Sequence, residues 1–267
     1  MAKPKILVLG GEGINCESET AYAFNQAGGQ SEFVHVRDLI ASPNNLNNYQ
    51  ILVFPGGFSF GDDTGAGNAL ANMMKAHLFQ DLRRFIDDGK LVLGICNGFQ
   101  VLANLGLLPA LDGKYGERQV ALVHNDSARY IDRWVDLEFQ NERSPWTTGL
   151  ERMSLPIAHG EGKFYAPFGI LKILDYARLV AARYVEGDMC KYHELPANPN
   201  GSLENIAAIT DASGLVLGMM PHPERAIDFT HRPDWTLLRE QYRREGKEMP
   251  NRGPSIQIFK NAIEYFK

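Results

Sequence analysis

The sequence predicts an α/β fold with a mostly parallel central sheet, helices on both faces and antiparallel strands in the C-terminal half. In residues 1–110, short runs that are apolar throughout alternate with stretches of helical periodicity. This is the pattern of parallel strands buried on both faces. In the second half, candidate strands alternate apolar and polar side chains or follow one another directly, which indicates antiparallel pairing.

The first half contains four predicted strands, each followed by a turn or helix signal. They span residues 6–9, 33–36, 51–54 and 91–93. Apolar residues at helical spacing predict helices at 17–27, 68–77, 80–88 and 98–105. In a parallel sheet, binding sites form beyond the carboxyl ends of the strands. We therefore expect the site in the turns that follow these strands.

The second half contains four further predicted strands and a closing helix. The strands span 134–139, 179–184, 206–210 and 215–219, and the helix spans 256–265. A hairpin signal, Asp211-Ala-Ser-Gly214, joins the last two strands. The charged stretch 228–254 is expected on the surface. Because no linker or repeat separates the two halves, we expect residues 1–267 to form a single domain.

Composition argues against several classes of protein. The net charge is −5, from 27 basic and 32 acidic residues, which gives no support for nucleic-acid binding. No apolar run is long enough to cross a membrane. The three cysteines are widely spaced and form no Cys-x-x-Cys pair, which argues against disulfides, secretion and a structural zinc site. We expect a cytoplasmic protein with no resident metal or cofactor.

The strongest local signal surrounds Cys96. A predicted strand ends, Cys96 follows with Gly94 and Gly98 two residues away on either side, and a helix begins. This is the nucleophile-elbow pattern, with cysteine in place of serine. The glycines avoid clashes at a sharp turn, and the amides at the helix N-terminus favour the reactive thiolate. Cys96 is therefore the predicted nucleophile.

A candidate base follows the last predicted strand. His222 lies between Pro221 and Pro223, which restrict the backbone and can hold an imidazole rigidly. Glu224, two residues on, can lie on the same side of an extended segment and accept the second ring N–H. We expect Cys96, His222 and Glu224 to form a catalytic triad.

A third element follows the predicted strand at 51–54. Its adjacent glycines can expose backbone amides that stabilise an oxyanion. The expected donors are the amides of Gly57 (or Phe58, one residue on) and Asn97. Phe58 and Gln100 are expected to contact the substrate.

Other sequence features give weaker evidence for a functional site. The glycines at 10–13 lack the Gly-Lys-Ser/Thr of a phosphate loop. Cys16 and Cys190 lack the glycine elbow and are expected to be structural. His159 and Glu161, which lie among glycines, either line a site or only shape a loop.

These residues resemble a known family. Gly-Ile-Cys-Asn-Gly-Phe-Gln at 94–100 and the later His222-Pro-Glu224 are similar to the class I glutamine amidotransferases. More narrowly, the chain resembles the glutaminase subunits of phosphoribosylformylglycinamidine synthase. Four longer motifs carry this resemblance, PGGFSFGD at 55–62, IAHGEGKF at 157–164, NPNGS at 198–202 and GMMPHPER at 218–225.

The resemblance implies a flavodoxin-like fold and a specific activity. Glutamine would be hydrolysed to glutamate and ammonia. A partner synthetase subunit would use the ammonia to convert formylglycinamide ribonucleotide to formylglycinamidine ribonucleotide in de novo purine biosynthesis. ATP and magnesium would bind to the synthetase, and a small third subunit often belongs to the complex. Segments 123–150 and 228–254 look enlarged relative to compact members, as partner contacts or tolerated surface insertions.

Three alternatives stay open at this point. The chain could supply ammonia to another amidotransferase pathway. It could be a stand-alone flavodoxin-like cysteine hydrolase, although such proteins commonly place His directly after the elbow cysteine, where this chain has Asn97. It could also be a non-catalytic binding subunit.

Overall fold

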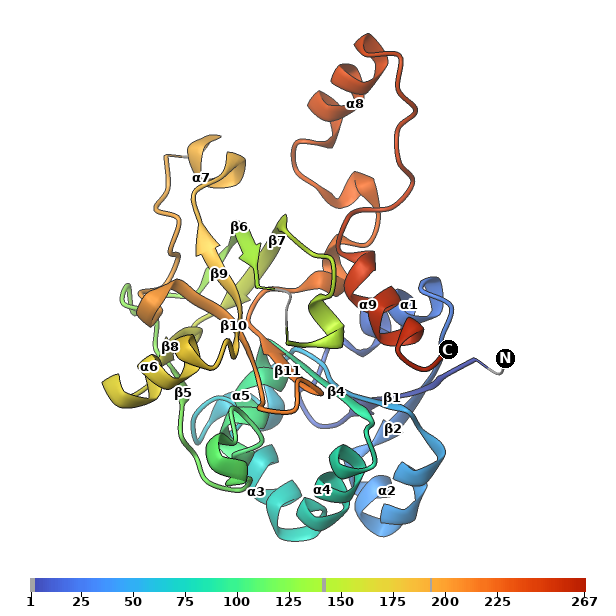
Figure 1. The fold of residues 1–267 in the computed structure, drawn as a ribbon, viewed down its shortest axis with the longest axis vertical. Helices are drawn as coiled ribbons and strands as arrows, with labels where there is room; N and C mark the ends of the chain where they lie inside the picture. The colour runs from blue at the N-terminus through green and yellow to red at the C-terminus, as the bar shows by residue number, and fades with distance from the viewer. Residues whose placement is uncertain (1–2, 141–142, 193) are drawn as a thin grey trace.

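The computed structural model describes residues 3–140, 143–192 and 194–267. Within them, a nine-stranded mixed sheet has the strand order β2-β1-β3-β4-β11-β10-β9-β6-β7, and β5 and β8 form a separate two-stranded sheet (Figure 1). No helix in these ranges is long and apolar enough to cross a membrane.

Five neighbouring strands form the parallel half of the sheet. They are β1 (Lys5–Gly10), β2 (Gln30–His35), β3 (Ile51–Phe54), β4 (Leu91–Ile95) and β11 (Val216–Met219). Every residue of β3 and β4 is buried, as expected of strands covered on both faces. β11 comes from the far end of the chain and pairs in parallel with β4.

Four antiparallel strands extend the sheet beyond β11. They are β10 (Ile206–Thr210), β9 (Val180–Val185), β6 (Ile131–Phe139) and β7 (Arg152–His159). The small second sheet pairs β5 (Ala121–Val123) with β8 (Lys163–Tyr165). The predicted fold class, a mostly parallel sheet followed by antiparallel strands, is confirmed.

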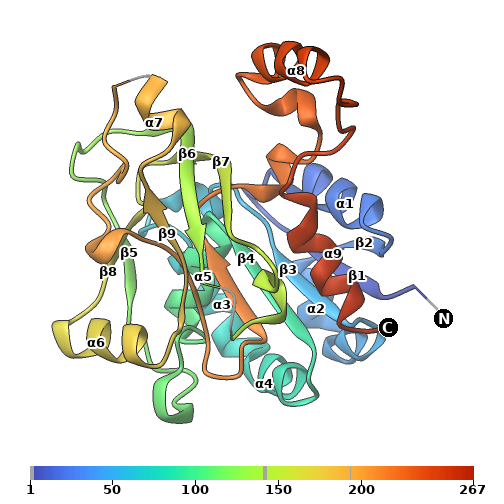
Figure 2. The ribbon, with the colours of Figure 1, turned by 45° about the horizontal axis from the view of Figure 1, so that its top comes forward.

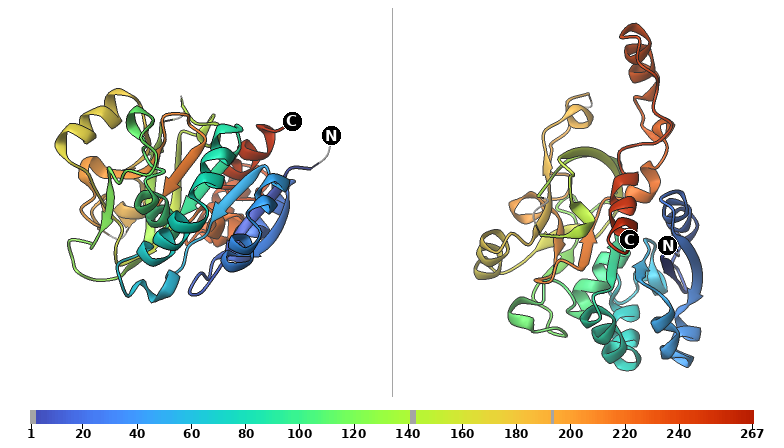
Figure 3. Two further views of the ribbon diagram at one scale, coloured as in Figure 1. Left: turned by 90° about the horizontal axis from the view of Figure 1, so that it is seen from below. Right: turned by 45° about the vertical axis from the view of Figure 1, so that its right-hand side comes forward.

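Helices cover both faces of the parallel strands. Figures 1 and 3 show α1 and α9 on one face, and α2, α3, α4 and α5 on the other. Their bounds are α1 Glu17–Gln26, α2 Val36–Ala41, α3 Asn68–His77, α4 Phe79–Asp87, α5 Asn97–Leu105, α6 Phe168–Tyr176, α7 Asp188–Tyr192, α8 Trp235–Arg244 and α9 Ile256–Glu264. Short 3-10 helices span Pro43–Asn48, Ser59–Asp62, Leu111–Gly113, Pro145–Thr147, Leu203–Asn205, Pro223–Ala226 and Phe229–His231.

The core joins residues that are far apart in the sequence. Phe24 of α1 meets Phe259 of α9 edge-to-face, with ring centroids 4.9 Å apart, and also meets Trp146 at 6.4 Å. All three side chains are fully buried. Such aromatic pairs contribute about 0.5–1.5 kcal/mol beyond their buried area. The C-terminal helix is therefore fixed against the first helix of the chain.

Several boundaries and elements differ from the sequence predictions. The second strand does not reach Val36, because His35 caps α2 and accepts a hydrogen bond from the backbone N–H of Arg37 at 3.3 Å. Segment 123–150 is not a surface insertion, since it supplies β6, an interior strand of the sheet. β7, α6 and α8 were not predicted.

Segment 228–254 lies on the surface, as predicted. It carries α8 away from the body of the molecule, as Figures 1 and 2 show, and α8 has no buried residue. The two ends of the segment come together where Asp228 and Arg252 form an isolated antiparallel bridge. We call residues 228–254 the arm.

Candidate active site

The sheet brings Cys96 and His222 together from opposite halves of the chain. β4 and β11 are adjacent and parallel, with Ile95 opposite Met219, and the N–H of Cys96 donates to the carbonyl of Met219 at 2.8 Å. Cys96 directly follows β4, and His222 follows β11 by three residues. Both side chains therefore leave the carboxyl edge of the sheet at neighbouring positions.

Cys96 lies in a strained turn that requires both flanking glycines. Its backbone has φ +51° and ψ −107°, which is unusual for a residue with a side chain. A Cβ at Gly98 would lie 1.9 Å from the carbonyl oxygen of Phe54, and one at Gly94 would lie 2.6 Å from Cδ1 of Leu102. The predicted steric reason for this glycine spacing is therefore present in the structure.

His222 and Glu224 form a buried pair. Nδ1 of His222 lies 2.6 Å from Oε1 of Glu224, and both residues are at most 2% exposed. We had expected an extended segment here, but Pro223–Ala226 forms a 3-10 turn. This turn still brings the two side chains together. The N–H of His222 donates to the carbonyl of Pro156 at 2.8 Å, which fixes the loop to β7.

The charge state of His222 follows from its neighbours. Burial lowers its pKa, but the Glu224 carboxylate, the Cys96 sulfur and the Cys16 thiol together raise the pKa well above its ordinary value. Nε2 of His222 is buried and has no aligned hydrogen bond among the described residues. The imidazole can therefore hold a proton beside Cys96 and release it at Nε2.

β7 borders the site. The Cys96 thiol lies 3.6 Å from the carbonyl oxygen of Ala158 and can donate to it. Cys96 and His222 thus both contact backbone carbonyls of the same strand.

Two backbone amides near Cys96 have no hydrogen-bond partner among the described residues. They are those of Gly57 and Asn97, the predicted oxyanion donors. Gly57 has φ +148°, and a Cβ there would lie 2.6 Å from the carbonyl oxygen of Gly13. The alternative donor, Phe58, is already engaged, because its N–H donates to that same carbonyl at 2.8 Å.

A cavity of about 120 Å³ opens at Cys96. Its lining includes Gly57, Phe58 and Gln100, all predicted site residues. Gln100 is 4% exposed, and both ends of its amide are used: Nε2 donates to the carbonyl of Glu161 at 2.6 Å, and Oε1 accepts from Asn97 at 2.9 Å. Gln100 therefore shapes the wall, while Phe58, 44% exposed, lies at the mouth.

His159 and Glu161, left open by the sequence, both line this cavity. Burial, aided by the charge of His222, lowers the pKa of His159 to about 4, so its imidazole is neutral. Asn125 directs Nδ2 at two carbonyls and accepts at Oδ1 from the N–H of Gly162, so Nδ1 of His159, 3.2 Å from Oδ1, is the protonated nitrogen. Nε2 is therefore an acceptor, and it is buried without a partner among the described residues.

Three further residues were missed by sequence reasoning. Asp62 and Tyr130 line the cavity, and Cys16 packs beside His222. Asp62 lies within a motif that pointed to the family, but nothing in its spacing marked its side chain. Cys16 follows β1, whose carboxyl end lies at the same edge as that of β4, and this position was the one signal that could have identified it.

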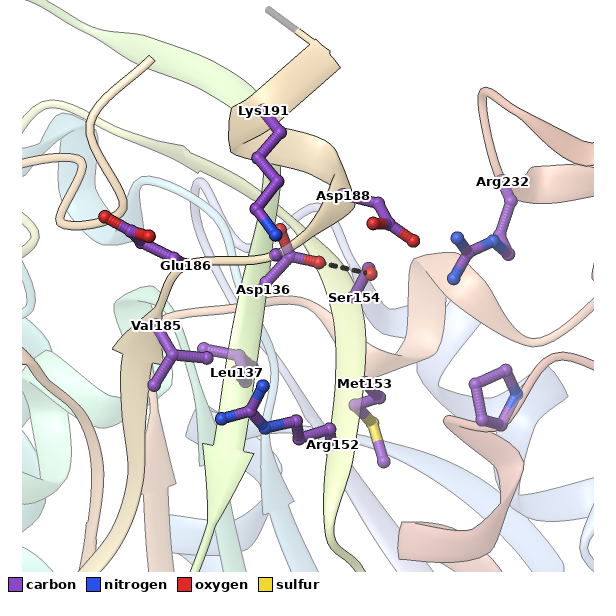
Figure 4. Close-up of a pocket in the computed structure, with 12 residues that line it drawn as sticks. Asp136, Leu137, Arg152, Met153, Ser154, Val185, Glu186, Asp188, Lys191 and Arg232 are labelled. Carbon is purple, nitrogen blue, oxygen red and sulfur yellow. Dashed lines mark hydrogen bonds between the residues drawn. The ribbon is translucent and has the colours of Figure 1, made fainter. Parts of the chain in front are cut away.

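A wider pocket of about 350 Å³ lies elsewhere, between β6, β7, α7 and the base of the arm (Figure 4). Figure 4 shows Lys191, Asp188 and Arg232 around its rim and Asp136 deeper inside. Asp136 is held by Ser154 Oγ at 2.7 Å and by the N–H of Met189 at 2.9 Å. The lining of this pocket contains no cysteine or histidine, and none of the predicted site residues lies in it.

Comparison with known proteins shows the family of the chain. The model of the CobB/CobQ-like glutamine amidotransferase domain matches residues 3–266. The phosphoribosylformylglycinamidine synthase subunit PurQ of Methanococcus maripaludis (strain C7) is 47% identical, over 98% of this chain and 97% of the relative. The subunit of the same name from Dehalococcoides mccartyi is 39% identical, over 99% and 98%.

Solved structures show the same fold. A chain in the structure of PurLQS from Thermotoga maritima superposes with a TM-score of 0.72 at 29% identity, covering all of both chains. A protein from Thermoplasma acidophilum shares the fold with a TM-score of 0.53 at 15% identity, covering 99% of this chain and 94% of that one. The chain belongs to the CobB/CobQ-like glutamine amidotransferase family, among its PurQ subunits.

Proposed function

We propose that this chain hydrolyses glutamine to glutamate and ammonia and supplies the ammonia to a partner synthetase. The synthetase uses it, with ATP, to convert formylglycinamide ribonucleotide to formylglycinamidine ribonucleotide in purine biosynthesis. The observation that carries the proposal is the placement of Cys96, in its strained elbow, beside the buried His222–Glu224 pair. The identity to PurQ subunits over almost the whole chain supports the pathway.

The chemistry follows from the positions of these groups. The Cys96 thiolate attacks the side-chain carbonyl carbon of glutamine, and the N–H groups of Gly57 and Asn97 donate to the oxyanion. His222, as imidazolium, gives its proton to the leaving nitrogen, which departs as ammonia. His222 then takes a proton from water, whose oxygen attacks the thioester and releases glutamate. Glu224 holds the imidazole in orientation throughout.

The cavity matches the substrate in size and polarity. A volume of about 120 Å³ suits an amino-acid side chain. The acceptor at Nε2 of His159 can take an N–H of the glutamine amide, which the glutamate carboxylate does not offer. The carboxylates of Asp62 and Glu161 lie on the same wall and suit the substrate ammonium group.

The assembly is proposed from the names of the relatives and from the structure of PurLQS, one chain of which resembles this chain. We propose that the partners are a synthetase and a small third subunit, with ATP and magnesium bound by the synthetase. A cytoplasmic location would accompany this role.

The decisive experiment uses Cys96→Ala in the complex with the synthetase. We expect glutamine-dependent synthesis to fall about a thousandfold or more, while ammonia still supports it, because only the nucleophile is lost. Cys190→Ala, which removes a buried thiol elsewhere, is the matched control. Full glutaminase activity in Cys96→Ala would refute the assignment of Cys96 as the nucleophile. Activity of the isolated wild-type chain on other amides or esters would favour a stand-alone hydrolase.

A further inference from the structure

Cys16 packs against the side of His222 that is linked to Glu224. It is 1% exposed, and its N–H donates to the carbonyl of Gly56 at 3.2 Å. A Cβ built on Gly56 would lie 2.8 Å from Cε1 of His222 and 3.0 Å from the Cys16 sulfur, so both side chains pack on this glycine. The sulfur also accepts from Nη2 of Arg225 at 3.0 Å. The proposed hydrolysis assigns no step to the Cys16 thiol.

Three chemically different ligand atoms meet at this point. A sulfur of Cys16, a ring nitrogen of His222 and a carboxylate oxygen of Glu224 all lie within 4.8 Å of one another. Oε2 of Glu224 is buried and lacks a hydrogen-bond partner among the described residues. The cluster therefore holds one carboxylate oxygen that no described contact uses.

We propose that Cys16, His222 and Glu224 form a binding site for a divalent ion of the zinc class, and that its occupancy switches off the glutaminase. Cysteine sulfur, imidazole nitrogen and carboxylate oxygen are the three ligand types that zinc takes in proteins. Hard ions such as magnesium prefer oxygen ligands alone and do not suit this set. Binding of the ion releases the thiol proton of Cys16 and the Nδ1 proton of His222 to solvent, and no bond of substrate is involved.

Occupancy and catalysis exclude each other on geometric grounds. Two ligands of a tetrahedral zinc ion lie roughly 3.4 Å apart, given bond lengths of about 2.1 Å. Nδ1 of His222 and Oε1 of Glu224 are 2.6 Å apart, so their hydrogen bond must open to admit the ion. The imidazole then loses the carboxylate that orients it. This consequence rests on the proposed function, whereas the binding itself does not.

Binding is measured in a protein that cannot turn over. In the Cys96→Ala chain the nucleophilic thiol is absent, so it cannot act as a ligand in place of Cys16. We expect one Co²⁺ per chain with a thiolate-to-cobalt absorption band, and one Zn²⁺ in competition with a chromophoric chelator. Adding Cys16→Ser should abolish the band and weaken zinc at least tenfold, whereas adding Cys190→Ala should change neither. An unchanged band and affinity after Cys16→Ser would overturn the proposal.

Inhibition is measured in the complex with the synthetase, with ammonia-dependent synthesis as a control for effects on the partner. We expect micromolar zinc, but not millimolar magnesium, to inhibit the glutamine-dependent reaction reversibly on chelation. The half-inhibiting zinc concentration, relative to each variant's own uninhibited rate, should rise at least tenfold in Cys16→Ser. An equal half-inhibiting zinc concentration in both proteins would indicate that the inhibitory ion binds to Cys96 instead. That result would overturn the proposed inhibition through Cys16. If the protein proved not to be a glutaminase, the cobalt measurement would still test the metal site.

Discussion

At the residue scale, Cys96 combines a reactive side chain with a backbone that favours glycine. A non-glycine residue at φ +51° and ψ −107° costs about 1–3 kcal/mol. Gly94 and Gly98 permit the turn but do not remove this cost, which falls on Cys96 itself. The strained turn places the sulfur at the sheet edge, between the helix N-terminus and His222.

We predict that Cys96→Gly is more stable than Cys96→Ala. Glycine relieves the strained backbone, and after its greater unfolded-state entropy is subtracted, an advantage of about 1 kcal/mol is expected. Urea unfolding of the two variants measures the difference. Both variants lack the sulfur, so the stability lost with its contacts cancels when the two are compared. An alanine variant as stable as the glycine variant would show that the turn is not strained.

His159 gives a prediction on the pH dependence of stability. Because its pKa is about 4 when folded and 6.5 otherwise, the unfolded chain binds a proton that the folded chain rejects. Stability is therefore unaffected above pH 6.5 and falls as the pH drops from there towards 4. At pH 5 this loss amounts to about 2 kcal/mol.

His159→Gln removes the titrating group while keeping a polar side chain of similar size. We expect its stability to fall less than that of the wild type between pH 7.5 and pH 5, by about 2 kcal/mol, in urea unfolding. His77→Gln, at an exposed position of α3 outside the cavity, is the control. An equal fall in wild type and His159→Gln would show that His159 is not buried in the neutral form.

At the element scale, the contact between α5 and β3 depends on the absence of a side chain at Gly98. Alanine there would place a Cβ 1.9 Å from a backbone oxygen, which only a shift of the helix or strand can relieve. We predict that Gly98→Ala destabilises the protein by about 3 kcal/mol or more. Gly169→Ala in α6 has no neighbour within 4 Å and should change stability by at most about 1 kcal/mol. Thermal or urea unfolding distinguishes the two, and equal effects would contradict the packing.

The strands of the parallel half were the clearest to predict from the sequence. β3 and β4 are buried on both faces, so every side chain is apolar and the run is visible without knowledge of the fold. α6 buries only Leu174 and α8 buries nothing, so their apolar patterns did not reveal them. β7 contains Pro156 and lies at the sheet edge, where a proline is tolerated but obscures the strand pattern.

The site divides in the same way. Cys96 and His222 are marked by local backbone demands, the glycine elbow and the flanking prolines, which the sequence carries within a few residues. Asp62, Tyr130 and Cys16 have no such mark, because long-range strand pairing brings them to the site: Cys16 follows β1, Asp62 follows β3 and Tyr130 precedes β6. The roles of the named residues stay predictions until the variants are measured.

At the scale of the whole molecule, the two halves of the chain share one sheet. β11 fills the place next to β4, and a Cβ at its Gly218 would meet Phe99 and Leu108 from the first half. The first half alone would expose β4 as a long apolar edge and leave Phe24 without Phe259 and Trp146.

We therefore predict that a fragment of residues 1–118 does not fold on its own. Circular dichroism and thermal unfolding should show no cooperative transition, in contrast to the full chain under the same conditions. A fragment with the complete β4–β11 neighbourhood, residues 1–227, should recover part of the transition. Cooperative unfolding of residues 1–118 would mean that the halves are separate domains rather than the single domain predicted.

The position of β11 also sets the time at which the enzyme can begin to work during its own synthesis. Val92 pairs with Val216, so the strand that delivers the imidazole is translated long after the one that delivers the thiol. A nascent chain on the ribosome carries Cys96 without His222, and the pairing must wait for a slow, long-range closure. With the roles proposed for these two residues, an unfinished polypeptide cannot consume glutamine or leak ammonia into the cell.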